Sequence, residues 1–198
     1  RDRQADIKDV GGFVAGELKN GRRTNPNVLS RSAITLDADF AKPGFIGNIE
    51  LLYPYKCVVY STHKHTAEKP KYRWVIPLDR DVTPDEYEAI ARRQADLMGM
   101  NQFDDTTYQP ARMMFWPSTS KDGEYVFKEI EGDTLCADKV LAEYRDWRDL
   151  STWPRSDRET EIHKKQVKKQ EDPLAKEGWI GAFCRTYTIQ EAIETFIP

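Results

Sequence analysis

Short apolar blocks separated by polar turns run along this chain of 198 residues, and several of them predict strands. Residues 34–40 read Ile-Thr-Leu-Asp-Ala-Asp-Phe, an apolar run that ends in two acids one residue apart. Branched and aromatic residues at 56–60 and 72–78 predict two strands of a hairpin joined by a basic loop. A further strand at 113–116 leads into a Ser/Thr-rich loop, and residues 124–127 are its predicted hairpin partner.

Helical signals stand between and after these strands. Thr83, Pro84 and Glu86 predict a helix start, because Thr83 can cap, proline suits the first helical position, and Glu86 completes a capping box. Apolar residues then recur at near-helical spacing as far as Gly99, which ends the run. Residues 45–52 are compatible with either a helix or a strand.

The last third of the chain is more charged. Residues 138–149 predict a helix, and residues 150–175 indicate a solvent-facing helix or a mobile loop. A second capping box, from Thr188 to Glu191, opens a short helix near the C-terminus. The alternation of strands and helices predicts an α/β (α+β) fold.

Composition narrows the function classes. The formal net charge is only −3, which argues against a uniformly basic nucleic-acid binder and leaves room for a local basic cleft. The three cysteines are widely spaced and form no C-x-x-C pair, so a zinc ribbon is not expected. No apolar run approaches the ~18 residues of a membrane span, and no signal peptide opens the chain. We therefore expect a cytoplasmic protein without a membrane partner.

The two acids at the end of the 34–40 block are the first candidate chemistry. Side chains alternate faces along a strand, so Asp37 and Asp39 point the same way. Burying two carboxylates together costs several kcal/mol unless something neutralises them. A divalent cation such as Mg²⁺ or Mn²⁺ is the usual neutraliser of such oxygens. The alternative is a strand end whose two acids are simply solvated.

Four features follow one another in the chain: D-x-D, S-x-H at a strand end, an apolar residue before an acid, and a basic residue in a Ser/Thr-rich loop. In order they are Asp37 with Asp39, Ser61 with His63, Phe103 with Asp104, and Lys121. This ordered set resembles the archaeo-eukaryotic primase superfamily, the primase-polymerases. It is most similar to the branch of phages and mobile elements that occurs with virulence-associated E-type helicases. No single motif is specific, and the order carries the resemblance.

The resemblance implies a small N-terminal α/β unit packed on a larger RRM-like unit with a mixed or antiparallel sheet, and a site between them. It implies template-directed nucleotidyl transfer, as a DNA primase or DNA polymerase, with two divalent cations, Mg²⁺ or Mn²⁺. Asp37, Asp39 and Asp104 would be the catalytic metal ligands. Asp105 adjoins Asp104, and we favour Asp104 because it directly follows apolar Phe103, although the Asp-Asp pair could instead cap a turn.

The resemblance also assigns nucleotide contacts. His63 would contact the incoming triphosphate as a catalytic-site residue, aided by the Ser61 hydroxyl. Arg112 and Lys121 would neutralise phosphate charge, and Arg73 is a weaker candidate for the same role. The loop that carries Lys121 departs from the glycine-containing loop frequent in the family.

The implied partners are a single-stranded DNA template, nucleoside triphosphates and a helicase domain in the same full-length chain. Residues 1–198 would then be one catalytic domain excised from a longer protein of a phage or mobile element, acting in a bacterial or phage-infected cell.

Two other classes stay open. A nicking replication-initiator nuclease would use His63 and His65 as metal ligands and a tyrosine, Tyr87 or Tyr108, as nucleophile, although Lys64 between the histidines is unsuited to a cation site. A non-catalytic nucleic-acid-binding module could stack bases on exposed aromatic side chains. Carboxylates in the site argue against that module, because they repel phosphates when no metal is present.

Overall fold

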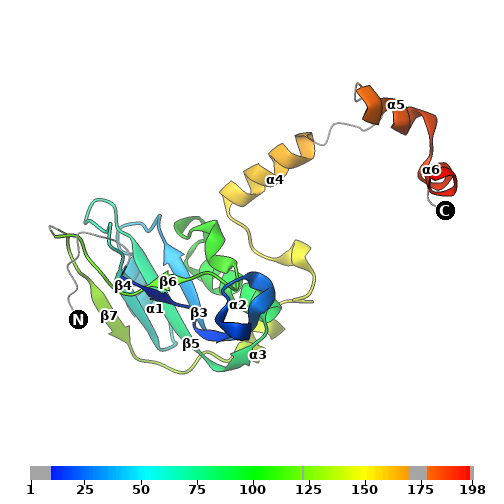
Figure 1. The fold of residues 1–198 in the computed structure, drawn as a ribbon. Helices are drawn as coiled ribbons and strands as arrows, with labels where there is room; N and C mark the ends of the chain where they lie inside the picture. The colour runs from blue at the N-terminus through cyan, green and yellow to red at the C-terminus, as the bar shows by residue number, and fades with distance from the viewer. Residues whose placement is uncertain (1–9, 122, 170–177, 197–198) are drawn as a thin grey trace. The chain divides into compact units, whose positions relative to one another are not determined.

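The computed structural model describes residues 10–121, 123–169 and 178–196. The chain divides into two compact units, Arg1–Ser156 and Asp157–Pro198. Figure 1 shows the first unit as a sheet with helices packed against it, and the second as a series of helices.

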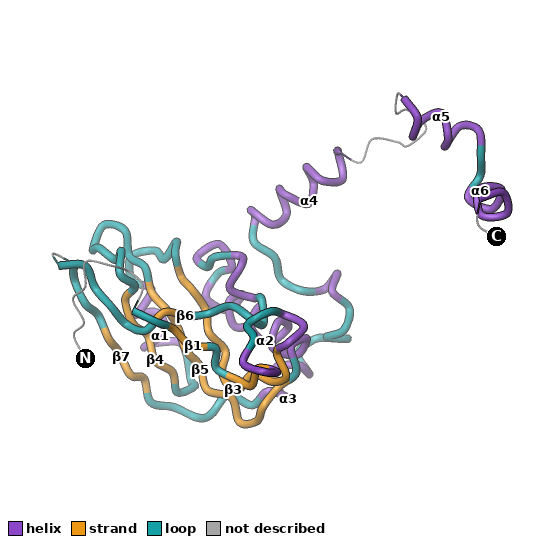
Figure 2. The backbone as a smooth tube through the Cα atoms, viewed as in Figure 1, coloured by secondary structure: helices purple, strands orange, loops and turns teal. Residues whose placement is uncertain are grey.

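An antiparallel sheet forms the centre of the first unit, with its strands side by side (Figure 2). Its strand order is β2-β3-β5-β4-β7, and every neighbouring pair runs antiparallel. A separate two-stranded antiparallel sheet joins β1 to β6. The strands are β1 (Gly12–Phe13), β2 (Gly16–Leu18), β3 (Val28–Ala38), β4 (Cys57–Ser61), β5 (Tyr72–Val82), β6 (Met114–Phe115) and β7 (Phe127–Ile130).

The predicted hairpin of 56–60 with 72–78 is confirmed as β4 paired with β5. The predicted hairpin of 113–116 with 124–127 is wrong. β6 pairs with β1, near the start of the described chain, whereas β7 pairs with the outer edge of β4. An unpaired strand edge offers a row of free backbone hydrogen-bonding groups. In this chain β7 pairs with such an edge, that of β4, in place of the predicted local hairpin.

The helices and 3₁₀ turns of this unit connect and cover the strands. They are η1 (Lys19–Gly21), η2 (Asn25–Asn27), α1 (Phe45–Leu52), α2 (Pro84–Met98), η3 (Met100–Gln102), η4 (Asp105–Tyr108), α3 (Ala137–Ala142) and η5 (Leu150–Thr152). The predicted capping box at the start of α2 is confirmed. Thr83 N donates to Glu86 Oε2 at 2.8 Å, and Glu86 N donates to Thr83 Oγ1 at 3.3 Å.

Two segments show how burial and local bonding decide helix length. Residues 45–52, compatible with two structures in sequence, form α1, whose Phe45 and Ile49 lie one helical turn apart and are both buried. The helix predicted at 138–149 ends at Ala142. Beyond it, Asp146 and Asp149 accept hydrogen bonds from the backbone two residues on, which competes with helix formation.

The core lies between the sheet and the helices. Ile34 and Leu36 of β3 and Trp74 and Ile76 of β5 are fully buried and pack with side chains of α1, α2 and α3. The alternate residues of β3 and β5 point away from this cluster. This second face of the sheet carries the candidate site, because side chains alternate along a strand.

The second unit consists of α4 (Asp157–Lys169), α5 (Gly178–Thr186) and α6 (Ile189–Phe196). Part of the charged stretch at 150–175 is thus the helix α4, and residues 170–175 lie outside the described residues. The second predicted capping box is confirmed, since Glu191 N donates to Thr188 Oγ1 and Thr188 N donates to Glu191 Oε2. No helix in the described ranges combines the length and apolarity needed to cross a bilayer.

Candidate metal and nucleotide site

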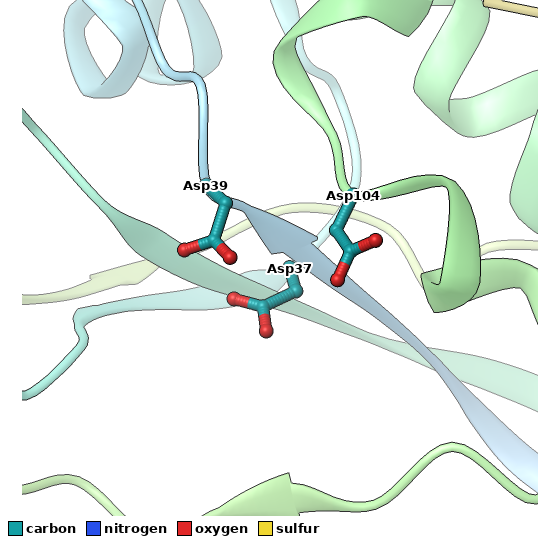
Figure 3. Close-up of side chains that lie close together, drawn as sticks. All are labelled: Asp37, Asp39 and Asp104. Carbon is teal, nitrogen blue, oxygen red and sulfur yellow. The ribbon is translucent and has the colours of Figure 1, made fainter. Parts of the chain in front are cut away.

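Three carboxylates converge where β3 ends (Figure 3). Asp37 is the penultimate residue of β3, and Asp39 is the first residue after it. Asp104 immediately precedes η4. One oxygen from each of the three lies within 4.8 Å of the others, a spacing that suits oxygen ligands of a metal ion. The two acids of the D-x-D stretch share one face, as the strand period predicts.

Backbone hydrogen bonds bring Asp104 to this place. Asp104 N donates to the carbonyl of Asp37 at 2.9 Å. Asp37 N in turn donates to Thr107 Oγ1 at 2.9 Å, and that hydroxyl donates to the carbonyl of Thr35. These bonds, made by backbone groups and the Thr107 hydroxyl, hold the start of η4 against the end of β3 and place Asp104 beside Asp37.

The neighbouring acids have different roles in the structure. Asp104 belongs to the cluster and also caps η4, because its Oδ1 accepts from Thr106 N at 3.0 Å. The turn cap considered from the sequence thus exists, but it coexists with the cluster. Asp105 instead accepts a hydrogen bond from Ser156 Oγ at 2.7 Å. Of the adjacent pair, the structure brings Asp104 into the cluster.

Each acid has a cationic neighbour. Lys71 Nζ lies 2.9 Å from Asp39 Oδ1, and Arg112 Nη2 lies 2.9 Å from Asp104 Oδ2. Arg73 Nη2 lies 3.7 Å from Asp37 Oδ2. Three basic side chains therefore offset the charge of the three acids even without a metal.

Strand register explains two of these pairs. Asp37 lies directly opposite Arg73 in the β3–β5 ladder, and Ala38 lies opposite Tyr72. The ladder ends at that pair, and the next residue of each segment is Asp39 or Lys71, which form the ion pair. The sequence indicated a role for Arg73 but none for Lys71, which falls in the basic loop predicted between the two strands. The available signal was the Lys-x-Arg spacing of 71 and 73, the basic counterpart of D-x-D on a neighbouring strand.

Asp37 is the most buried of the three acids. Its residue is 6% exposed, and burial raises the pKa of its carboxyl above the ordinary value. Arg73 and Arg112 oppose that rise in pKa, whereas the charges of Asp39 and Asp104 add to it. Asp37 Oδ1 is buried and has no hydrogen-bond partner among the described residues. A buried carboxylate oxygen without a partner, within reach of two further carboxylates, fits a hard divalent cation.

A pocket of about 400 Å³ opens beside the cluster. Asp37 and Asp39 line it together with five basic side chains: Arg23, Lys64, Lys71, Arg73 and Arg112. The basic residues outnumber the acids, so the pocket favours an anionic ligand once the acids are neutralised. Its volume lies within the range of small-ligand sites.

The remaining predicted residues, Ser61, His63 and Lys121, are not among those that line this pocket. Ser61 is fully buried, and its Oγ accepts from Val126 N at 2.9 Å, so its hydroxyl bonds to the neighbouring chain segment and the adjacent Thr62 lines the pocket instead. His63 lies between two lining residues, with its Nδ1 3.4 Å from Ser118 Oγ. Lys121 is exposed. The structure thus brings Arg112 to the acids directly, but not Ser61 or Lys121.

The geometry disfavours a nicking nuclease. Tyr87 is fully buried and Tyr108 is 1% exposed, so neither hydroxyl can reach a DNA phosphate without unfolding. His65 is also buried, and its Nδ1 accepts from Lys71 N at 3.0 Å, which makes it part of the turn before β5. Within the described ranges, the group suited to a metal consists of aspartates and not of histidines.

Fold and site together define an antiparallel α/β domain that presents three carboxylates beside a basic pocket. The profile of the VapE N-terminal domain matches residues 1–156, and the chain belongs to this family. The expected relation to virulence-associated E-type proteins is thereby confirmed.

Two further comparisons complete the picture. Among solved structures, the chain is similar to the AEP domain of the primase-polymerase (PrimPol) of cyanophage S-2L, at 17% identity and a TM-score of 0.48. That similarity covers 66% of this chain and 68% of the cyanophage chain. No curated protein matches the chain.

Proposed function

We propose that this domain catalyses template-directed nucleotidyl transfer, as a DNA primase or DNA polymerase, in the replication of a phage or mobile element. One observation carries the proposal: three carboxylates meet at the end of β3 beside a pocket dominated by basic side chains, and one buried oxygen of Asp37 has no partner among the described residues. This combination suits a ligand that brings both metal and phosphate. The membership in the VapE N-terminal domain family agrees with a role in such replication.

Asp37, Asp39 and Asp104 would hold Mg²⁺ or Mn²⁺. Two such cations, when bound, favour deprotonation of an attacking hydroxyl and neutralise charge on the α-phosphate and the leaving pyrophosphate. The protein would contribute the orientation of these carboxylates, which backbone bonds between β3 and η4 maintain. Preorganised ligands of this kind avoid rearrangement during the reaction.

The basic side chains would bind the triphosphate. Arg112 is well placed, because its guanidinium already lies between Asp104 and Asp37, at 2.9 and 4.0 Å. Arg23 and Lys64 line the same pocket and would attract the outer phosphates. His63 would contact the triphosphate through the ring nitrogen that does not face Ser118, and Lys121 would approach it from the adjacent loop.

The wider partners follow from the same proposal. A single-stranded DNA template would lie against the pocket, and nucleoside triphosphates would be the substrates. We further propose that residues 1–198 act as one catalytic domain within a longer cytoplasmic protein that carries a helicase. These assignments rest on the family and on the chemistry of the pocket.

Primer extension tests the function. The assay combines labelled nucleotides, a single-stranded template with or without primer, and Mn²⁺ or Mg²⁺. Asp37→Ala and Asp39→Ala should abolish extension while folding survives, and Asp104→Asn should lower it at least about 100-fold, as expected for loss of a metal ligand. His63→Ala should raise the nucleotide concentration required.

Asp105→Asn is the matched control, since Asp105 adjoins the cluster but bonds to Ser156. It should leave extension within about two-fold of the original protein, as expected for a residue outside the reacting centre. Full extension by Asp37→Ala would refute the metal assignment. Nucleotide binding that is equally strong with and without divalent cations would instead favour the non-catalytic module.

A further inference from the structure

Asp39 and Lys71 form an ion pair at the edge of the metal cluster. The β3–β5 ladder ends at the Ala38–Tyr72 pair, and the next residue of each chain segment carries one of the two charges. Lys71 Nζ lies 2.9 Å from Asp39 Oδ1. The two side chains are 29% and 34% exposed, so water reaches the pair and either partner can leave without unfolding the sheet.

Arg73 and Arg112, the other two basic side chains beside the acids, each have more than one contact. Arg73 has a side-chain exposure of only 5%, and its Nη1 donates to the carbonyl of Phe115 at 3.2 Å. Its guanidinium also lies 5.7 Å from the centre of the Phe115 ring. Arg112 contacts two acids, Asp104 and Asp37. The Lys71 ammonium, in contrast, has one such contact among the described residues, and its partner is Asp39.

A metal ion held by the three acids and the Lys71 ammonium would both be attracted to the carboxylate of Asp39. Mg²⁺ binds carboxylate oxygens at about 2.1 Å. A divalent ion on Asp39 Oδ1 would therefore stand within a few ångströms of an ammonium that already lies 2.9 Å from that oxygen. Like charges at this separation repel strongly in a partly buried site. The Lys71 ammonium can move away from the metal, because it lies at the end of a flexible four-carbon chain.

We propose that Lys71 is an exchangeable counter-ion: it neutralises Asp39 while the acids hold no metal, and it moves to a nucleotide phosphate when metal takes its place. This inference rests on the proposed function. Lys71 lines the same pocket as Thr62 and Lys64, so the displaced ammonium stays in the space where an anionic ligand would bind. Metal binding and nucleotide binding are then coupled through one side chain.

The coupling predicts opposite effects of one substitution. Lys71→Met removes the charge and keeps most of the length. Without nucleotide, the variant should bind Mn²⁺ about 5- to 10-fold more tightly, in the range typical of coupled sites. With saturating Mn²⁺, it should bind a non-hydrolysable nucleoside triphosphate about 10-fold more weakly, because a phosphate contact is lost. Lys71→Arg keeps the charge and should bind Mn²⁺ within about two-fold of the original protein, since this coupling depends on charge.

Calorimetry and the electron paramagnetic resonance of free Mn²⁺ measure these affinities without any turnover. The matched control is Lys128→Met, which removes a lysine from another exposed ion pair, that with Glu50 at 3.2 Å. It should leave both affinities unchanged. Thermal melting checks that each variant is folded, and Lys71→Gln serves as a second neutral variant should Lys71→Met fail to fold.

The outcomes separate the two proposals. Tighter Mn²⁺ binding by Lys71→Met with weaker nucleotide binding supports the exchange. Mn²⁺ affinity that is unchanged or reduced in Lys71→Met, while Asp39→Asn abolishes binding, overturns the exchange and leaves the metal site standing. An original protein that binds no Mn²⁺ overturns both the exchange and the proposed function.

Discussion

Replacing Asp37 by asparagine separates the contribution of this residue to folding from its contribution to metal binding. The substitution keeps the shape of the side chain and removes its charge. Asp37 is almost fully buried and has one oxygen without a hydrogen-bond partner among the described residues. We expect Asp37→Asn to stabilise the metal-free protein and to abolish the stabilisation by Mn²⁺.

The size of the effect follows from the distances. At an effective dielectric constant of ~20, Asp39 and Asp104, within 4.8 Å, each repel Asp37 by about 3.5 kcal/mol. On the same scale Arg73 at 3.7 Å attracts it by about 4.5 kcal/mol, and Arg112 at 4.0 Å attracts it by about 4 kcal/mol. The attractions exceed the repulsions by less than about 2 kcal/mol. Loss of hydration costs several kcal/mol for a buried ion and exceeds this difference, so ionised Asp37 destabilises the folded protein.

The pKa of the Asp37 carboxyl is raised, which agrees with a destabilising effect of its charge. A raised pKa in the folded state means that ionised Asp37 opposes folding. The advantage of the asparagine variant should be complete above that raised pKa and should vanish as the pH falls through it towards the ordinary value near 3.8. A net gain of about 2 kcal/mol at pH 7 would raise the melting temperature of a unit of this size by roughly 4–8 °C.

Thermal melting in EDTA and in Mn²⁺, from pH 4 to pH 8, measures both effects. The original protein should gain about 2.7 kcal/mol when Mn²⁺ is present at ~100 times its Kd, and the variant should gain nothing. Asp105→Asn is the control, and it should keep the response to Mn²⁺. A lower melting temperature of Asp37→Asn in EDTA at pH 7 would refute the reasoning, since attraction to Arg73 would then exceed the cost of burial.

Three further predictions concern the framework of the site. Arg31 is fully buried and donates hydrogen bonds to several oxygens, so Arg31→Met should lower the free energy of unfolding by about 3 kcal/mol or more, measured with urea. Tyr87→Phe should lose about 1 kcal/mol of stability and keep extension within about two-fold, whereas a covalent DNA adduct that this substitution abolishes would contradict the polymerase assignment. Burial lowers the pKa of His65, so its contribution to stability is present above the ordinary value of 6.5 and is lost as the pH falls below it. Melting at pH 7.5 and pH 5 should therefore show a larger loss for the original protein than for His65→Gln, and equal losses would refute this reasoning.

Local patterns predicted the elements whose cause is local. The capping boxes at Thr83 and Thr188 formed as expected, because all their partners lie within three residues along the chain. The shared face of Asp37 and Asp39 followed from strand alternation alone. The end of α3 was missed, because the side chains of Asp146 and Asp149 bond to nearby backbone and the helical pattern does not show this.

The candidate site required information from distant parts of the chain. Asp104 and Asp105 are neighbours with the same chemistry, and the bond from Asp104 N to the Asp37 carbonyl brings the first of them into the cluster. The pairing of Lys71 with Asp39 depends on the register of β5 against β3. Ser61 matched the S-x-H pattern, yet it is buried and its Oγ accepts a hydrogen bond from Val126 N.

The sequence by itself determined the mixed α/β class, the acidic strand end and the family, because composition, periodicity and ordered motifs are properties of the chain. Only the tertiary structure decided which strand edge β7 joins, which acid completes the trio and which cation faces each acid. Those choices depend on hydrogen bonds and charges between residues far apart in sequence, and they take effect only when the sheet has assembled.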